Sequence, residues 1–218
     1  MSDYPIISLK KKKARAVQNR HPWVFSGAIA DTGTAKEGDT VAVQDANGKL
    51  LGYGHFDPQS PFRVRMFAFG SQALEINADF WHGRLSTALS FREQLYTPET
   101  DTAYRIINAE GDNCPGIIID RFEHTAVMQL RTPAARETQT LLKDWLMAQN
   151  GIAHIYDKTV VDDKEIGWLT DAPKRISFLE NGLKMVVDPD EGQKTGAYLD
   201  QRDSHRLIRR YAKGRRVL

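Results

Sequence analysis

The segment Val41-Ala42-Val43-Gln44-Asp45-Ala46-Asn47-Gly48-Lys49-Leu50-Leu51-Gly52-Tyr53-Gly54 decides the fold of the first part of the chain. Two runs rich in apolar residues flank Asn47-Gly48, a dipeptide that strongly favours a hairpin turn. We therefore expect two antiparallel strands here. An isolated hairpin is marginal in water, so we expect neighbouring segments to add strands to it.

Short apolar runs on both sides of the hairpin continue the strand pattern. Residues 6–9 predict a strand, and residues 21–25 predict an edge strand or a turn, because Pro22 cannot donate a hydrogen bond. Residues 62–67 alternate apolar and basic side chains, which would place Arg63 and Arg65 on the same face of a strand. Several short strands so close together predict a small β-barrel in the first 72 residues.

A helix and a second group of strands follow the barrel. Residues 73–98 carry apolar side chains at helical spacing, which predicts a linking helix. In residues 99–187, strand patterns surround one helix that starts at Thr132-Pro133, where threonine suits the N-cap and proline the first helical position. Asn181-Gly182 predicts another hairpin. We expect a compact central α+β module.

The segment from Gly192 to Arg202 holds the densest group of hydrogen-bonding side chains in the chain. Its two glycines allow sharp bends and close approach to a ligand. The candidate residues of this loop are Gln193, Lys194, Thr195, Tyr198, Asp200 and Arg202. We expect a helix over residues 200–213 and a strand that begins at residues 215–218. Residues 188–218 are thus expected to open a third domain that is cut off inside its first strand.

The bulk composition excludes several classes of protein. The 218 residues are 41% hydrophobic and 27% charged, which is ordinary for a globular protein, and no apolar run approaches the roughly 20 residues of a membrane span. Cys114 is the single cysteine, so no internal disulfide is expected. The N-terminal lysine run leads into polar residues, unlike a secretory signal. These features predict a cytoplasmic protein.

Positive charge is concentrated at both ends of the sequence although the net charge is only +2. The candidate RNA-binding residues are Lys10, Lys11, Lys12, Lys13, Arg15, Arg20, Arg63 and Arg65. A second basic cluster runs from Arg202 to Arg216. Such clusters suit contact with a phosphate backbone. Their alternative interpretation as solvated faces stays open.

No motif for nucleotide phosphates or metal ions is present. Gln193 separates Gly192 from Lys194-Thr195, so the segment departs from the P-loop pattern. The six histidines lack the spacing of metal ligands, and we expect no metal site. Cys114 precedes Pro115 in a turn, and we interpret it as a packed turn residue rather than a catalytic thiolate.

Four blocks of the sequence carry a resemblance to a known family. They are His21–Gly27, Asn108–Asp112 with Pro115-Gly116, Glu180–Gly182, and Gly192–Gly196 with Leu199–Asp203. In order and spacing they resemble the bacterial S-adenosylmethionine-dependent methyltransferases that form 5-methylcytosine in large-subunit ribosomal RNA. The resemblance covers nearly the whole chain, and the last block is its most specific part.

The resemblance implies an α+β architecture: a PUA-like barrel, a linking helix, a central α+β module and the opening segment of a Rossmann-like methyltransferase domain. It implies S-adenosylmethionine as the cofactor and ribosomal RNA as the partner, and it leaves a homodimer open. The nucleophilic cysteine of the family would lie beyond this chain, so no catalytic residue is assigned and Cys114 does not take that role. We therefore expect this chain alone to transfer no methyl group and to bind the cofactor weakly.

In this interpretation the six loop residues form one wall of the active-site cleft, with side chains that are exposed and mobile. In an alternative, the loop only locks the central module onto the next domain, and Asp200 caps the following helix. Two further functions stay open, namely a stand-alone PUA-type RNA-binding module without catalysis and a protein-interaction scaffold.

Overall fold

The structure, a computed structural model, describes residues 4–217. Their strands form a six-stranded, a five-stranded and a two-stranded sheet. The chain divides into two units, each described by itself below. The first unit consists of Met1–Ala88, Ile107–Ile117 and Leu130–Leu142, and the second of Leu89–Ile106, Ile118–Gln129 and Lys143–Leu218.

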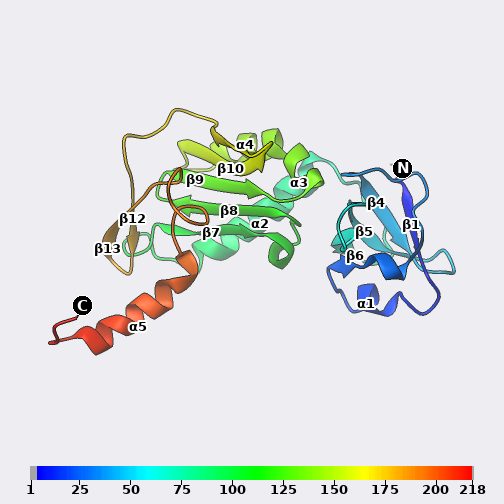
Figure 1. Cartoon of the computed structure of the whole chain (residues 1–218), viewed down its shortest axis with the longest axis horizontal. Helices are drawn as coiled ribbons and strands as arrows, with labels where there is room; N and C mark the ends of the chain where they lie inside the picture. The colour runs from blue at the N-terminus through cyan, green and yellow to red at the C-terminus, as the bar shows by residue number, and fades with distance from the viewer. Residues whose placement is uncertain (1–3, 218) are drawn as a thin grey trace. The chain divides into compact units, whose positions relative to one another are not determined.

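The six-stranded sheet of the first unit is the small barrel expected from the sequence (Figure 1). Its elements are β1 (Ile6–Leu9), α1 (Arg15–Gln18), β2 (Trp23–Val24), the 3-10 turn η1 (Ser26–Ala28), β3 (Ile29–Asp31), β4 (Thr40–Gln44), β5 (Leu50–Phe56) and β6 (Val64–Phe69). The strand order is β2-β6-β5-β4-β1-β3, in which β1 and β4 are parallel. Alternate residues of these strands fill one apolar core that includes Ile7, Val41, Val43 and Met66.

The hairpin at Asn47-Gly48 is confirmed, since β4 and β5 pair antiparallel. The Asp45 carboxylate accepts hydrogen bonds from the amides of Asn47 (2.8 Å) and Lys49 (3.0 Å), which closes the turn. Gly48 has a φ of +81°, a conformation that glycine adopts at little cost. The sequence thus determines this hairpin locally, through one carboxylate and one glycine.

A long helix, α2 (Ala78–Glu93), follows the barrel. Asn77 caps it by accepting a hydrogen bond from the Phe80 amide (3.0 Å), as the sequence predicts. Within the first unit, the Arg84 guanidinium of α2 donates hydrogen bonds to the carbonyls of Phe67 and Asn113. This side chain connects α2 to β6 and to the turn before Cys114, and its burial lowers the pKa of Arg84.

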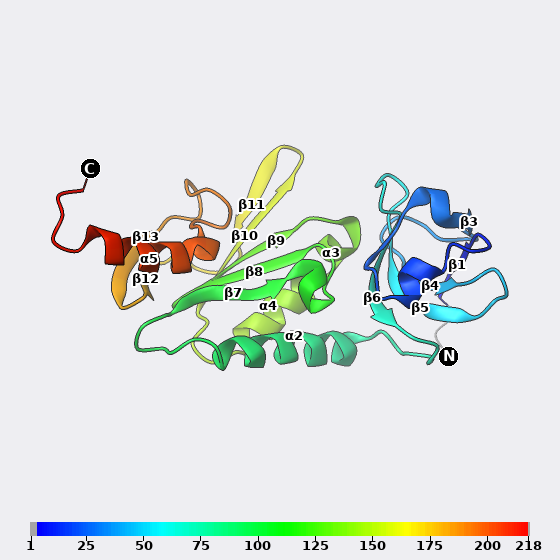
Figure 2. The same ribbon diagram turned by 90° about the horizontal axis from the view of Figure 1, so that it is seen from below.

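The five-stranded sheet lies almost entirely in the second unit, in the order β11-β10-β9-β8-β7. Along the chain, the strands of this sheet and the segments between them are β7 (Ala103–Asn108), the 3-10 turn η2 (Ala109–Asp112), β8 (Ile117–Phe122), β9 (Thr125–Leu130), α3 (Pro133–Glu137), α4 (Gln139–Met147), β10 (His154–Val161) and β11 (Lys164–Trp168). Of these, η2 and α3 belong to the first unit. Figure 2 shows α4 on one face of this sheet and the segment that follows β13 on the other side.

The last elements are the hairpin β12 (Ile176–Glu180) and β13 (Leu183–Val187), the 3-10 turn η3 (Leu199–Gln201) and the helix α5 (Arg202–Ala212). Asn181 and Gly182 both have positive φ (+51° and +76°), as the predicted two-residue hairpin turn requires. One apolar cluster joins this hairpin to the sheet, and it includes Ala103, Phe122, Phe178 and Val187.

Two expectations about this region are wrong, and one strand was not expected. The helix that starts after Thr132 breaks at Thr138 into α3 and α4, because the Thr138 hydroxyl donates back to the Ala135 carbonyl (2.7 Å) and its backbone leaves helical geometry. The strand β11 was not among the elements expected from the sequence. Residues 215–217 form no strand, and Leu218 lies outside the described residues.

None of the helices in residues 4–217 combines the length and the apolar character that crossing a membrane requires.

His55 of β5 is a buried titratable group in the first unit. Only 6% of the residue is exposed, its ring lies 4.7 Å from that of Phe67 and 5.6 Å from that of Trp81, and its Nδ1 atom has no hydrogen-bond partner among the described residues. Burial lowers the pKa of His55 to about 4, because the apolar surroundings disfavour the imidazolium.

We predict that acid destabilises the barrel through His55. Below a pH of about 6.5 the unfolded chain protonates this imidazole and the folded chain does not, so the free energy of unfolding falls between pH ~6.5 and ~4, by up to ~3 kcal/mol. Thermal unfolding over this pH range should show a weaker pH dependence for His55→Gln than for the wild type. His21→Gln, at an exposed position, is the control. Equal pH dependence in wild type and His55→Gln would contradict the prediction.

Candidate functional site

The Gly192–Arg202 loop is fixed to the sheet of the second unit by a buried carboxylate. Asp120 of β8 is 1% exposed, and its Oδ2 accepts a hydrogen bond of 2.5 Å from the Thr195 hydroxyl. Arg105 of the neighbouring strand β7 donates to the same carboxylate through Nε (2.8 Å) and Nη2 (3.0 Å). The Asp120 carboxylate in turn raises the pKa of Arg105. A buried carboxylate is tolerated because it receives these donors.

Two glycines and a lysine shape the start of the loop. A Cβ atom on Gly192 would lie 2.6 Å from the Cα of Gly196, and one on Gly196 would lie 2.4 Å from a methyl group of Val187. Only glycine fits at these two positions, because the backbone of the loop passes close to itself and to Val187. Lys158 of β10 is 8% exposed and donates hydrogen bonds to the carbonyls of Pro189 and Gly192. The loop is therefore held at its base as well as at Thr195.

Arg202 anchors the other end of the loop, where α5 begins. Its guanidinium donates to the Ala103 carbonyl, lies 3.2 Å from the Asp101 carboxylate and stacks 4.5 Å from the centre of the Tyr96 ring. The Arg202 side chain is only 12% exposed. This arginine is thus occupied in holding the helix to the sheet.

Four of the six candidate loop residues stand at the surface and interact with one another. The Lys194 ammonium lies 2.9 Å from both carboxylate oxygens of Asp200 and 4.4 Å from the centre of the Tyr198 ring. The Tyr198 hydroxyl donates to the Gln193 side-chain oxygen. The hydrogen bond from Lys194 lowers the pKa of Asp200. Gln193, Lys194, Tyr198 and Asp200 together form what we call the loop surface.

Two expectations for this loop need correction. The side chains were expected to be exposed, but Thr195 is 1% exposed and Arg202 is largely buried. The reason is that Thr195 donates a hydrogen bond to the buried Asp120 carboxylate and Arg202 forms an ion pair with Asp101. Asp200 was considered as a helix cap, but α5 has no side-chain cap bond and the Asp200 carboxylate pairs with Lys194. The pairing of Arg105 with Asp120 was not expected from the sequence. The available signal was one residue of each charge in two neighbouring segments with a strand pattern.

The candidate RNA-binding residues of the first unit divide into two groups. Lys10, Lys11, Lys12, Lys13, Arg15 and Arg20 are exposed. Arg63 and Arg65 are half-buried, and Arg65 forms an ion pair of 2.8 Å with Glu110, which also accepts a hydrogen bond from the Trp23 indole (3.2 Å). The alternative interpretation of Arg65, as part of a solvated strand face, is therefore wrong, because Arg65 is half-buried and Glu110 neutralises its charge. The prediction that Arg63 and Arg65 bind RNA stays a prediction. The exposed group, whose residues lie before α1, at its start and just after its end, is what we call the basic surface.

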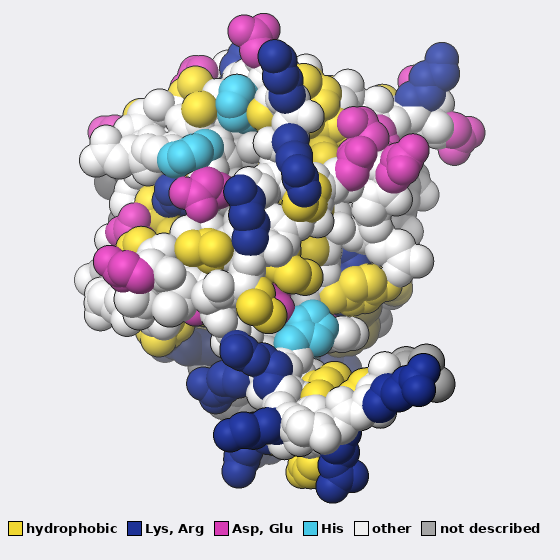
Figure 3. All heavy atoms as spheres, turned by 90° about the vertical axis from the view of Figure 1, so that its left-hand side faces the viewer, with side chains coloured by type: hydrophobic (Ala, Val, Ile, Leu, Met, Phe, Trp, Pro, Cys, Tyr) yellow, Lys and Arg dark blue, Asp and Glu magenta, His cyan; other side chains and the backbone are white. Residues whose placement is uncertain are grey.

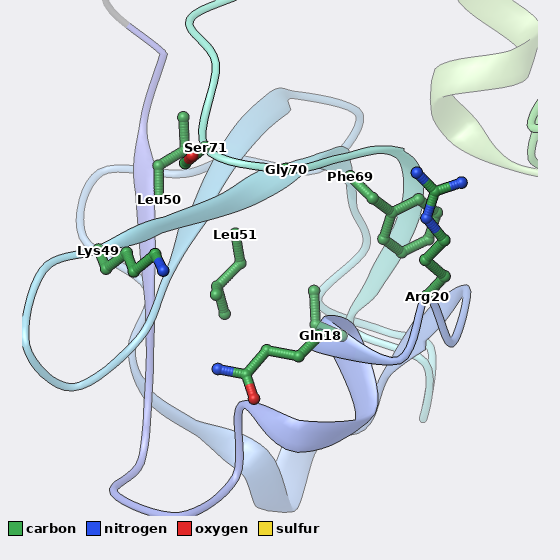
Figure 4. A pocket seen from close by; sticks show the side chains of 9 residues that line it. Gln18, Arg20, Lys49, Leu50, Leu51, Phe69, Gly70 and Ser71 are labelled. Atoms are coloured by element: carbon green, nitrogen blue, oxygen red, sulfur yellow. The ribbon is translucent and has the colours of Figure 1, made fainter.

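A pocket lies beside the basic surface, between α1 and the ends of β5 and β6. It has a volume of about 260 Å³ and is lined by Val17, Gln18, Arg20, Lys49, Leu50, Leu51, Phe69, Gly70 and Ser71. Figure 4 shows Leu51 in the middle of the labelled residues, with Lys49 on one side and Arg20 beside Phe69 on the other. Of these residues only Arg20 was a candidate from the sequence.

The second basic cluster is carried by α5. Figure 3 shows Lys and Arg side chains gathered over this part of the second unit, with hydrophobic side chains among them. Leu207, Ile208 and Tyr211 are 47%, 57% and 71% exposed. Arg209 donates to the Asn181 carbonyl, which ties the helix to the β12–β13 turn.

Cys114 is fully buried in the first unit, and its thiol lies 3.6 Å from the Asp112 carbonyl. This confirms its interpretation as a packed turn residue. Among residues 4–217, no three histidine, cysteine or acidic side chains come close enough together to hold a metal ion.

Comparisons with known proteins agree with this architecture. Residues 7–69 match the family model of the PUA-like domain. The chain is 39% identical over 220 residues to ribosomal RNA large subunit methyltransferase I of Erwinia tasmaniensis, 38% over 225 residues to that of Shewanella denitrificans and 35% over 221 residues to that of Alteromonas mediterranea. These alignments cover 96–97% of this chain and 55–56% of the relatives, so the chain spans about half the length of the curated relatives it matches.

Two solved structures share the fold. One, from Streptococcus mutans and assigned to the SAM-dependent methyltransferases, has a TM-score of 0.78 at 17% identity. The other, a methyltransferase-type protein solved with SAH, has a TM-score of 0.75 at 18% identity. Each match covers 94% of this chain and 53–54% of the solved one.

We predict that the hydroxyl of Thr195 fixes the loop. Thr195→Val removes a donor from the buried Asp120 carboxylate, at a cost of ~1–3 kcal/mol for a hydrogen bond to a charged group. In native-state hydrogen exchange, the amides around Thr195 should then exchange roughly 5–150 times faster.

Thr195→Ser keeps the hydroxyl and should restore most of the protection against exchange. Lys194→Gln, at an exposed position, should change the stability by less than ~0.5 kcal/mol. If Thr195→Val and Thr195→Ser behave alike, the bond to Asp120 does not hold the loop.

Proposed function

We propose that this chain supplies the RNA-binding and substrate-positioning part of an S-adenosylmethionine-dependent ribosomal RNA methyltransferase. The observation that carries the proposal is that nearly the whole chain aligns, at up to 39% identity, with proteins named ribosomal RNA large subunit methyltransferase I. The PUA-like match over residues 7–69 and the exposed cations of the basic surface support RNA as the substrate.

We extend the proposal to the reaction itself, methylation of a cytosine at C5, on the basis of the four blocks of residues that resemble that family. In this proposal, the loop surface forms one wall of the cleft, and Lys194 contributes the positive charge that suits an RNA phosphate. Thr195 and Arg202 hold that wall in place from beneath. None of the residues of this chain is assigned to bond making.

S-adenosylmethionine is the methyl donor in this proposal, and the loop surface alone does not fit it. Each of the four side chains there is already paired, Lys194 with Asp200 and Tyr198 with Gln193. Such groups can contact a ligand that a second element holds, but they present no open set of donors and acceptors. We therefore derive no reaction step through the cofactor.

A stand-alone RNA-binding module is the second candidate function. The interactions of Lys194 with Asp200 and of Tyr198 with Gln193 favour this second candidate. Side chains that already have such partners within the loop do not need a ligand to provide them. Both candidates require the basic surface to bind RNA, and they differ in whether methyl transfer follows.

We predict salt-dependent RNA binding through the basic surface. Charge reversal of Lys11, Lys12 and Arg15 to glutamate should weaken binding of single-stranded RNA and lower the slope of log K against log salt by about 2, since each lost phosphate contact contributes ~0.7. Fluorescence anisotropy at several salt concentrations measures both quantities. Reversal of the exposed Lys164 and Lys174 in the second unit is the control. An unchanged slope after reversal of Lys11, Lys12 and Arg15 would rule out the basic surface as the RNA contact.

We also predict weak binding of S-adenosylmethionine to the 218-residue chain. Isothermal titration should show no micromolar dissociation constant, because the loop surface offers no open cradle for the cofactor. Micromolar binding would contradict this view of the loop.

A further inference from the structure

We propose that another pocket of the barrel, between the η1–β3 segment and the connection from β5 to β6, binds a small zwitterion of the kind of a free amino acid with an apolar side chain. The Arg63 guanidinium binds the carboxylate of this ligand, the Asp31 carboxylate binds its ammonium group, and Phe56 contacts its apolar part. The inference does not depend on the function proposed above, and it gives Arg63 a ligand other than RNA.

The pocket lies in the first unit, at the edge of the six-stranded sheet. Its volume is about 570 Å³, within the ~300–1,000 Å³ that is usual for small-molecule sites. One wall comes from η1 and β3, and β3 is the last strand in the order of the sheet. The other wall comes from the end of β5 and the segment before β6. A hydrogen bond from the Ser26 amide to the Pro61 carbonyl (3.3 Å) joins the two walls.

The inner side of the pocket is apolar. Phe56 is 5% exposed and belongs to the barrel core, and Ile29 is partly buried and packs against the same core. The core therefore holds these side chains in place before any ligand arrives. Such a wall favours a ligand with an apolar group, because their contact removes apolar surface of both partners from water.

The guanidinium of Arg63 is the group of this pocket that most needs a partner. Arg63 is half-buried, yet its side chain forms no hydrogen bond or ion pair among residues 4–217. Arg65, two residues later, is paired with Glu110. A guanidinium presents a planar fork of N–H donors, and a carboxylate can accept two of them in parallel. The pocket thus offers an open site for a carboxylate.

Asp31 supplies the opposite charge on the other wall. Its Oδ1 accepts a hydrogen bond from the Gly33 amide (3.0 Å), while Oδ2 has no donor in the described part of the chain. This oxygen is available to the ammonium group of a ligand. The hydroxyls of Ser26 and Thr32, which also line the pocket, can donate and accept further hydrogen bonds.

The balance of charge favours a zwitterion over a nucleic acid. The lining residues, all of which the structure describes, include one cation, Arg63, and one anion, Asp31. A phosphate backbone carries a single sign of charge, so the Asp31 carboxylate would repel it. A ligand with one carboxylate and one ammonium group satisfies both side chains.

A matched series of ligands tests each part of this assignment. L-leucine should shift the NMR signals of the Asp31, Thr32 and Arg63 amides, with a dissociation constant of ~1 mM for so small a ligand. The analogue 4-methylpentanoate lacks the ammonium group, 3-methylbutylamine lacks the carboxylate and glycine lacks the apolar side chain. Each should bind about tenfold more weakly than leucine, because it loses one of the contacts. No shift with leucine, or equal affinity for leucine and 4-methylpentanoate, would overturn the inference.

Two variants connect each charged group of the ligand to its partner. Arg63→Gln should weaken leucine binding about tenfold and leave the weak binding of 3-methylbutylamine unchanged. Asp31→Asn keeps the oxygen that accepts the Gly33 amide, so the barrel should stay folded. It should weaken leucine binding about tenfold and leave that of 4-methylpentanoate equal or stronger. Glu37→Gln, at an exposed position outside the pocket, is the control. Leucine binding that is unchanged in Arg63→Gln would contradict the assignment.

The outcomes also separate this inference from RNA binding. If Arg63→Gln weakens binding of single-stranded RNA and leucine causes no shifts, Arg63 is an RNA contact and the inference is overturned. If the wild-type chain binds leucine as expected but fails to bind RNA, the proposed function is overturned and the zwitterion site stands.

Discussion

The hydrogen bonds to the buried carboxylate of Asp120 are the constraint on which the candidate loop depends. A carboxylate that is 1% exposed is stable in the fold only if donors replace the water that it loses, and Arg105 and Thr195 supply them. Arg105 comes from the adjacent strand, so it fixes the carboxylate within the sheet. Thr195 comes from a loop 75 residues later in the chain, so the same carboxylate also fixes that loop. This point of attachment decides which loop residues are buried and which face solvent.

In the first unit, too, the role that a side chain can play depends on the residues that it contacts. Arg65 and Arg20 are both arginines of the barrel, yet Glu110 neutralises Arg65, while Arg20 lies exposed at the rim of a pocket. Charge alone did not distinguish them in the sequence. The ion pair with Glu110 neutralises the charge of Arg65, whereas Arg20, whose backbone is left-handed, is exposed. The surface of exposed cations in the first unit is therefore smaller than the distribution of basic residues in the sequence suggested.

Features that depend on a few neighbouring residues were predictable. The hairpins at Asn47-Gly48 and Asn181-Gly182, the Asn77 cap and the Thr132-Pro133 helix start all formed, because each is a local competition between backbone conformations. The break at Thr138 and the strand β11 were missed. A side chain that bonds back to its own helix and an edge strand without a strong apolar pattern give weak local signals.

The sequence by itself determined the succession of strands and helices, the position of the turns and the segment in which the candidate loop lies. These follow from the side chains and backbone preferences of adjacent residues. Only the tertiary structure decided that Thr195 and Arg202 are anchors, that Arg65 is neutralised, and that Arg20, Lys49 and Phe69 share one pocket. The physical reason is that burial and ion pairing depend on partners far apart in the chain, and those partners meet only when the sheets form.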